Sequence, residues 1–183
     1  ICDGLRFTSA QGLLLNSILE DEPNVNLDAQ FKELKNKIKR FSGIEAVDPV
    51  KTFNGNLRKY QREGLGWLEF LEEFGLGGIL ADDMGLGKTI QCLAFLEKRR
   101  LKTKNKMPSL LVAPKSLLGN WKNEAATFTP KLDVLIYAGN DRHTLDAAQF
   151  ESFDLVVTTY QTMLRDFEFL KDLCWDCLIC DEA

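Results

Sequence analysis

The sequence predicts an α/β fold in which helices cover both faces of a mostly parallel sheet, preceded by a short helical segment. From Leu57 onward, short apolar runs alternate with longer stretches of helical periodicity. Runs that are apolar throughout are typical of strands buried on both faces, and helices join such strands in parallel sheets. The chain has 183 residues, of which 45% are hydrophobic, so it can bury one good core with a small appendage.

The first part of the chain, residues 1–52, differs from the rest and predicts helices followed by a linker. Residues 8–19 begin with a capping box and continue with apolar residues, which favours a short helix. A second, amphipathic helix is predicted from Leu27 to Phe41. Residues 45–56 have no clear period and predict a linker. The amphipathic face either packs on the following domain or preceding chain, or serves as a partner-binding or regulatory element.

The rest of the chain alternates predicted strands and helices. A helix from Leu57 to Phe74 is stopped by Gly75. The predicted strands are residues 78–81, 109–113, 132–137, 155–158 and 177–180. Helices are predicted between these strands. The first of them ends near Lys102, and the others cover residues 116–128, 144–150 and 161–170. Ligands of such sheets bind beyond the carboxyl ends of the strands, and the polar clusters described below all follow a strand.

The loop from Asp82 to Thr89 has the composition of a phosphate cradle between a strand and a helix. Its glycines let backbone N–H groups converge on phosphate oxygens, and the helix start adds partial positive charge. Lys88 can reach the β- and γ-phosphates, and the Thr89 hydroxyl can bind Mg²⁺. The full pattern has glycine at the position of Asp82, so the loop alone leaves an ordinary Gly-Lys-Thr turn as an alternative.

The last residues place two carboxylates, Asp181 and Glu182, directly after an apolar run. Downstream of a phosphate loop, this pattern is typical of the metal-holding strand of a nucleotide hydrolase. Asp181 would hold Mg²⁺, directly or through water, and Glu182 would orient or deprotonate the attacking water. Taken alone, the pair is also compatible with a solvated strand end.

Three of the five cysteines lie within residues 174–180. In a strand Cys177 and Cys180 point to opposite faces, so the three sulfurs cannot converge on one ion. The only histidine is His143. We therefore expect buried structural thiols and no zinc or iron–sulfur site.

The net charge is −4 and the pI is near 5.2. A domain that binds nucleic acid on its own usually has an excess of basic residues, and this chain does not. The basic run from Lys98 to Lys106 is interpreted as a solvated helix end and loop. No apolar run approaches a membrane span, and the first residues lack a secretory signal. We expect an intracellular protein without a membrane partner, at the nucleoid in the cytoplasm of a bacterium or in the nucleus of a eukaryote.

Several stretches, in chain order, resemble successive motifs of the Swi/Snf-type ATPases, the double-stranded-DNA translocases of helicase superfamily 2. They are LRKYQREG at 57–64, LADDMGLGKT at 80–89, LVAPKSLLGNW at 111–121, TTY at 158–160 and DEA at 181–183. The resemblance accounts for Asp82, because this family's loop opens with an Ala-Asp-acidic-Met-Gly run. It implies a three-layer RecA-like P-loop domain over residues 53–183, the first of two lobes, after the segment 1–52.

The resemblance also implies ATP and Mg²⁺ as cofactors and a set of site residues. Gln61 resembles the glutamine that reads adenine, since an amide can pair with the N6/N7 edge of that base; the alternative is a helix-surface glutamine. The implied catalytic residues are Lys88, Asp181 and Glu182, and the implied metal ligands are Thr89 and Asp181. The implied ATP-binding residues are Gln61, Asp83, Met84, Gly85, Leu86, Gly87, Lys88 and Thr89.

Four further residues resemble contacts to the phosphates of the tracked DNA strand. Lys115 and Ser116 follow one predicted strand, where an exposed helix start suits an anion; Ser116 is alternatively an N-cap. Thr158 and Thr159 end another strand, where β-branched residues also simply favour strand structure. Trp67 and Trp121 are expected to pack in the core.

The family continues beyond Ala183 with the histidine of its Asp-Glu-Ala-His box and then a second RecA-like lobe. That lobe brings arginines to the γ-phosphate, and losing such a residue typically removes on the order of 10³–10⁵ in rate. We therefore expect this piece alone to hydrolyse ATP hardly at all. In the intact protein the expected partners are double-stranded DNA and the second lobe, with a protein partner for residues 1–52 left open. The alternatives are a strand-separating or RNA-directed superfamily 2 helicase, and a degenerate nucleotide- or protein-binding module.

Overall fold

The computed structural model describes residues 32–33, 36–37, 43–102 and 107–183. The predicted helix at residues 8–19 lies outside the described residues. Of the predicted helix from Leu27 to Phe41, only residues 32, 33, 36 and 37 are described, and these are helical. The domain boundary predicted at residue 52 stays a prediction.

A four-stranded parallel sheet forms the centre of the molecule, which confirms the predicted fold class. Its strands are β1 (Ser109–Val112), β2 (Val134–Tyr137), β3 (Leu155–Thr158) and β4 (Leu178–Cys180), in the order β2-β3-β1-β4. Val112 of β1 lies opposite Thr158 of β3 and Cys180 of β4. The carboxyl ends of these strands are therefore level, and the residues that follow them share one edge of the sheet.

The helices also follow the predicted order. They are α3 (Lys59–Phe74), α4 (Lys88–Lys102), α5 (Leu118–Phe128), α6 (Ala147–Phe150), α7 (Tyr160–Arg165) and α8 (Phe167–Leu170). A 3₁₀ turn, Lys115–Leu117, leads into α5, and another, Asp141–Thr144, precedes α6. Gly75 ends α3 in the left-handed conformation, with φ of 62°, as predicted.

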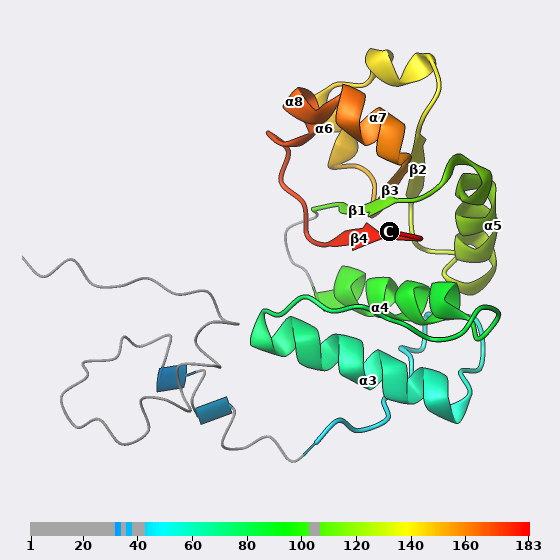
Figure 1. The fold of residues 1–183 in the computed structure, drawn as a ribbon, viewed down its shortest axis with the longest axis vertical. Coiled ribbons are helices and arrows are strands. Elements are labelled where there is room, and N and C mark those ends of the chain that lie inside the picture. The colour runs from blue at the N-terminus through cyan, green and yellow to red at the C-terminus, as the bar shows by residue number, and fades with distance from the viewer. Residues whose placement is uncertain (1–31, 34–35, 38–42, 103–106) are drawn as a thin grey trace, which may run out of the picture.

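Helices cover both faces of the sheet (Figure 1). On one face, α4 and α5 pack on β1 and β3 around Leu93, Trp121 and Leu155. On the other face, α6, α7 and α8 pack around Phe150 and Leu170. The remaining long helix, α3, packs on the outer side of α4 through a third cluster that includes Leu65, Ala94 and Phe95. The two central strands, β1 and β3, are fully buried and mostly apolar because helices cover both faces of the sheet.

The predicted strand at residues 78–81 is wrong: this segment has no regular secondary structure. The described residues place no strand beside the outer edge of β4, which pairs only with β1. A strand needs a neighbour for its backbone hydrogen bonds, so an apolar run alone does not create one. Both the segment and the strand edge remain open to solvent, with Ile79 85% exposed and Leu178 60% exposed.

Residues 45–56 are irregular, as predicted for a linker, but they pack closely against the domain. The backbone N–H of Val47 donates to the Arg62 carbonyl at 3.0 Å, and that of Asn54 donates to the Phe128 carbonyl at 2.7 Å. The Phe53 ring is buried and stacks on Phe128, with centroids 6.0 Å apart. This segment therefore forms part of the core around α3.

None of the helices that the structure describes is long and apolar enough to cross a membrane.

Candidate nucleotide site

The loop before α4 turns on two glycines in the left-handed region. Gly85 has φ of 86° and Gly87 has φ of 80°, conformations that other residues rarely adopt. A Cβ atom at Gly87 would also lie 2.7 Å from Nε2 of Gln61. The turn then passes directly into α4 at Lys88. The predicted glycine turn that opens a helix is thus present, although the strand before it is absent.

The Lys88 ammonium lies inside the curve of the loop. Its Nζ donates to the carbonyl of Asp82 at 2.7 Å and approaches that of Asp83 at 3.4 Å. The Asp82 carboxylate, in turn, accepts a hydrogen bond from Nε2 of Gln91 at 2.9 Å. Two residues of α4 therefore hold the first residue of the loop, one through its backbone and one through its side chain.

Gln61 is buried, at 7% exposure, and contacts the loop, so the helix-surface alternative is wrong. Its Nε2 donates to the Leu86 carbonyl at 3.0 Å, and its Oε1 accepts from the backbone N–H of Arg58 at 2.9 Å. The Tyr60 hydroxyl donates to the same Leu86 carbonyl at 3.0 Å. One amide hydrogen and one lone pair of Gln61 remain for a ligand. Recognition of adenine stays a prediction.

The end of β4 brings Asp181 to the same region as α4. Its backbone N–H donates to the Val112 carbonyl at 2.8 Å, which continues the pairing with β1. Burial raises the pKa of the Cys92 thiol on α4 to about 12, and the negative charge of Asp181 adds to this. Cys92 lies one turn after Lys88, and Ile179 of β4 packs in the same cluster as Cys92 and Leu93, so the end of β4 lies near the first turns of α4. Figure 1 shows the C-terminus directly beside this helix.

Side chains from two other elements orient Asp181. The indole N–H of Trp121 donates to Asp181 Oδ2 at 2.8 Å, and the Tyr160 hydroxyl donates to its carbonyl at 2.9 Å. Trp121 is 3% exposed, which confirms the predicted packing role. Its hydrogen bond was not predicted, although a buried indole N–H usually has a partner. The neighbouring Glu182 is exposed and has φ of 52°.

The four residues predicted to contact DNA lie at or just after the carboxyl ends of β1 and β3. Lys115 and Ser116 are exposed in the 3₁₀ turn after Pro114. Thr158 is buried, and its hydroxyl donates to the Tyr137 carbonyl at 2.7 Å. The Thr159 hydroxyl caps α7 by accepting from the Thr162 N–H at 3.0 Å. The two threonine hydroxyls thus have partners within the chain, and DNA contact by all four residues stays a prediction.

The expectation of buried thiols is wrong for Cys174 and Cys180, which are exposed. Cys180 belongs to the open edge strand β4, and this explains its exposure. Cys92 and Cys177 are partly buried. Within the described part of the chain, no three histidine, cysteine, aspartate or glutamate side chains gather as a metal site would require.

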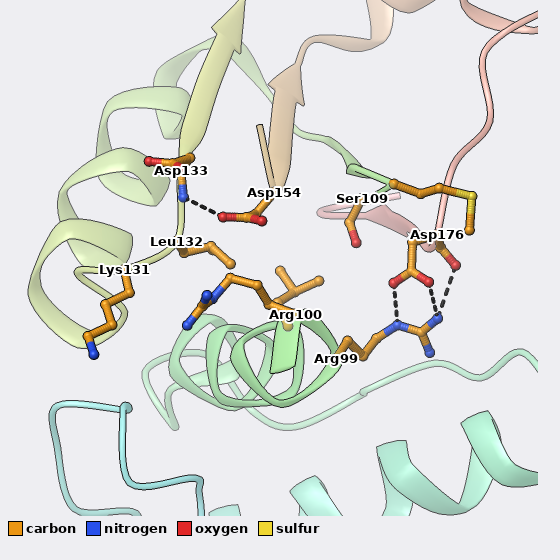
Figure 2. A pocket seen from close by; sticks show the side chains of 10 residues that line it. Arg99, Arg100, Ser109, Lys131, Leu132, Asp133, Asp154 and Asp176 are labelled. Carbon is orange, nitrogen blue, oxygen red and sulfur yellow. Dashed lines mark hydrogen bonds and ion pairs between the residues drawn. The ribbon is translucent and has the colours of Figure 1, made fainter. Parts of the chain in front are cut away.

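A polar pocket of about 250 Å³ lies at the opposite, amino-terminal edge of the sheet (Figure 2). Ser109 and Asp176 line it beside Arg99 and Arg100 of α4. Arg99 forms a two-pronged ion pair with Asp176, at 2.6 and 2.7 Å, and a further pair with Glu72 at 2.9 Å. Both arginines are paired with carboxylates of the chain, so we interpret this part of the pocket as a structural ion-pair network.

This network also corrects part of the interpretation of the basic run: residues 98–100 are partly buried and paired, whereas residues 101 and 102 are exposed at the helix end, as expected. Lys98 pairs with Glu69 of α3, and Lys102 pairs with Glu72 at 3.0 Å. Residues 103–106 of the run lie outside the described residues. The described part of the run therefore joins α4 to α3.

Residues 60–183 match the protein family described as SNF2-related domain. YwqA of Bacillus subtilis is 41% identical over 177 residues, which are 90% of this chain and 19% of that protein. The ISWI chromatin-remodeling complex ATPase ISW2 of Saccharomyces cerevisiae is 41% identical over 134 residues, or 71% of this chain and 12% of its own length. The chain thus spans less than a fifth of the length of these relatives.

The fold is also similar to a solved structure, the Sulfolobus solfataricus SWI2/SNF2 ATPase core in complex with dsDNA. The TM-score is 0.67 and the identity 37%, over 75% of this chain and 28% of that one.

Proposed function

Because the chain belongs to the SNF2-related domain family of ATP-dependent helicases and chromatin-remodelling ATPases, we propose that it is the ATP-binding lobe of a double-stranded-DNA translocase. One observation carries this proposal. The buried Gln61 contacts the glycine loop that carries Lys88, and Asp181 follows strand β4, which packs against the first turns of α4; these residues come from three separate parts of the chain. Asp181 lies at the edge of the sheet where parallel α/β folds bind ligands.

The residues at this edge fit MgATP. Asp181 has one carboxylate oxygen held by Trp121, and its other oxygen has no hydrogen-bond partner among the described residues. Carboxylate and hydroxyl oxygens suit Mg²⁺, so Asp181 and Thr89 would hold the ion, which would neutralise charge on the phosphates. The loop residues 83–89 would present backbone N–H groups to the phosphates.

The chain's own side chains then have distinct tasks. Lys88 would exchange the carbonyls of Asp82 and Asp83 for phosphate oxygens, with its charge unchanged. Glu182 is exposed next to Asp181 and would orient or deprotonate the attacking water. Gln61 would offer its remaining amide hydrogen and lone pair to adenine. Because arginines of a second lobe would complete the site, this lobe alone would be nearly inactive as a hydrolase.

Duplex DNA is proposed as the track of the intact protein. The similar Sulfolobus core was solved with dsDNA, and Lys115 and Ser116 are exposed at the edge that carries the nucleotide site. The chain's net charge of −4 means that this lobe alone offers little general attraction for DNA. ATP binding would draw two lobes together over the duplex, and hydrolysis would let them separate and step. Such a protein would work at the nucleoid or in the nucleus.

Assays on the full-length protein test this proposal. We expect ATP hydrolysis that is stimulated by double-stranded DNA more than by single strands or RNA. We also expect displacement of a third strand from a DNA triplex without separation of the duplex strands. Efficient unwinding without duplex stimulation would instead identify a strand-separating helicase, and stimulation by RNA alone an RNA-directed one. Absence of hydrolysis with any nucleic acid would identify a binding module.

A further inference from the structure

Gln91 has an unusual environment for a polar side chain. It is fully buried on α4, one turn after Lys88. Its Nε2 donates to Asp82 Oδ2 at 2.9 Å and lies 3.3 Å from the Gly87 carbonyl. Its Oε1 is buried without any hydrogen-bond partner in the described structure. This oxygen presses against Gly64 of α3, where a Cβ atom would lie only 1.9 Å away.

Packing alone does not explain a glutamine at this position. A buried amide oxygen without a partner is unfavourable, whereas methionine would fill similar space with no polar group to satisfy. Turning the amide over would place its oxygen against the Asp82 carboxylate, so the donor must face Asp82. The useful part of the side chain is therefore its N–H group.

Lys88 and Gln91 are three residues apart on α4 and thus share a helix face. Lys88 holds the Asp82 carbonyl, and Gln91 holds the Asp82 carboxylate. A lysine that turns to a phosphate gives up its bond to that carbonyl. The Gln91 bond is then the side-chain contact that still ties Asp82 to α4.

We propose that Gln91 is a positioning residue for nucleotide binding. By holding Asp82, it keeps the first half of the phosphate loop in place while Lys88 engages phosphate. It also keeps the Asp82 carboxylate directed to α4, so this negative charge does not compete with the phosphates for Lys88. The inference rests on the proposed function, because it requires that the loop binds a nucleotide.

The test compares variants of the full-length protein by MgATP titration, by thermal unfolding without nucleotide, and by duplex-stimulated hydrolysis. Gln91→Met removes the donor and the unpaired oxygen together and keeps the volume. Asp82→Asn keeps an oxygen that can accept the Gln91 bond. Gln161→Met, at an exposed position on α7, is the matched control.

We expect Gln91→Met to weaken MgATP binding and raise KM about tenfold, since a bond to a charged group is lost. The change in kcat should be smaller than the change in KM. The Tm without nucleotide should change little, because removal of the unpaired oxygen offsets the loss of the bonds to Asp82 and Gly87. Asp82→Asn keeps only an uncharged acceptor for this bond, so it should weaken MgATP binding, but less than Gln91→Met does. Gln161→Met should bind MgATP within about twofold of the wild type.

Wild-type affinity in Gln91→Met would overturn the inference. A fall in Tm that accounts for the weaker binding would also overturn it, because the role would then be structural. Failure of the wild type itself to bind MgATP would contradict the proposed function, and so the two failures are distinguishable.

Discussion

At the scale of single residues, Gly66 shows how closely the segment before α3 approaches that helix. A Cβ atom at Gly66 would lie 1.9 Å from the backbone carbonyl oxygen of Glu45. The bond from the Val47 N–H to the Arg62 carbonyl holds this segment in place. The obstructing atom is backbone, so it cannot move away as a side-chain end could.

Gly66→Ala should therefore lower the free energy of unfolding by about 1–3 kcal/mol, the usual cost of overpacking. This loss should occur although alanine favours a helix over glycine by about 1 kcal/mol. Urea denaturation of the chain measures it. Gly119→Ala in α5 is the matched control, because a Cβ there meets nothing within 4 Å, and it should be neutral or stabilising. A Gly66→Ala variant as stable as the wild type would contradict this account of the packing.

Residue identity predicted some features of the site and missed others. The positive φ of Gly85 and Gly87 follows from a glycine-rich turn into a helix, and the burial of Trp121 follows from its size. The hydrogen bond from Gln61 to Leu86 spans 25 residues, and that from Gln91 to Asp82 spans 9. The first partner depends on how α3 packs on the loop and the second on how the loop folds back onto α4, and no local pattern contains that information.

At the scale of elements, the last turns of α4 contain a buried ion pair between two residues of the helix itself. Glu97 is fully buried and pairs with Arg100, at 2.8 and 2.9 Å. Burial opposes ionisation of Glu97, but hydrogen bonding and the positive charge of Arg100 outweigh it and hold the pKa of this carboxyl below its usual value. The pair therefore stabilises the fold while Glu97 is ionised.

Removing the cation leaves a buried charge, so Arg100→Met should cost about 3 kcal/mol of stability at neutral pH. The lowered pKa sets the sign of the pH dependence. The wild type keeps this stabilisation above the ordinary carboxyl pKa and loses it as the pH falls through the lower pKa of the folded state. The difference between variant and wild type should therefore narrow in acid. Chemical denaturation from neutral pH to acid measures the difference in stability between Arg100→Met and the wild type. Arg165→Met, at an exposed position, is the control. A difference that stays constant with pH would rule out the Glu97 charge as its cause.

The limits of element prediction have physical reasons. The apolar runs correctly predicted the four strands that pair in the sheet. Residues 78–81 are also apolar, but they have no neighbouring strand in the described sheet and form no strand. The predicted helix at residues 161–170 is split into α7 and α8 at Asp166, whose side chain accepts from Arg142 at 2.6 Å. Both features involve partners that are distant in the sequence, and local periodicity does not identify such partners.

At the scale of the whole molecule, the two edges of the sheet have different roles. The carboxyl edge carries the phosphate loop, Asp181 and the exposed Lys115, whereas the amino edge is a network of paired charges. The chain spans 28% of the Sulfolobus SWI2/SNF2 core to which it is similar. The proposed reaction would require a second lobe, whereas phosphate binding can be tested directly with this chain.

Nucleotide-dependent thermal stabilisation of the chain tests that central claim most directly. MgATP should raise the Tm of the wild type, since a ligand at about 100 times its Kd adds about 2.7 kcal/mol to stability. Lys88→Ala should abolish this rise, whereas Lys122→Ala, at an exposed position on α5, should retain it. Comparing the rise for each variant with its own Tm without nucleotide separates binding from any change in basal stability. An undiminished rise in Lys88→Ala would show that the loop does not hold phosphate.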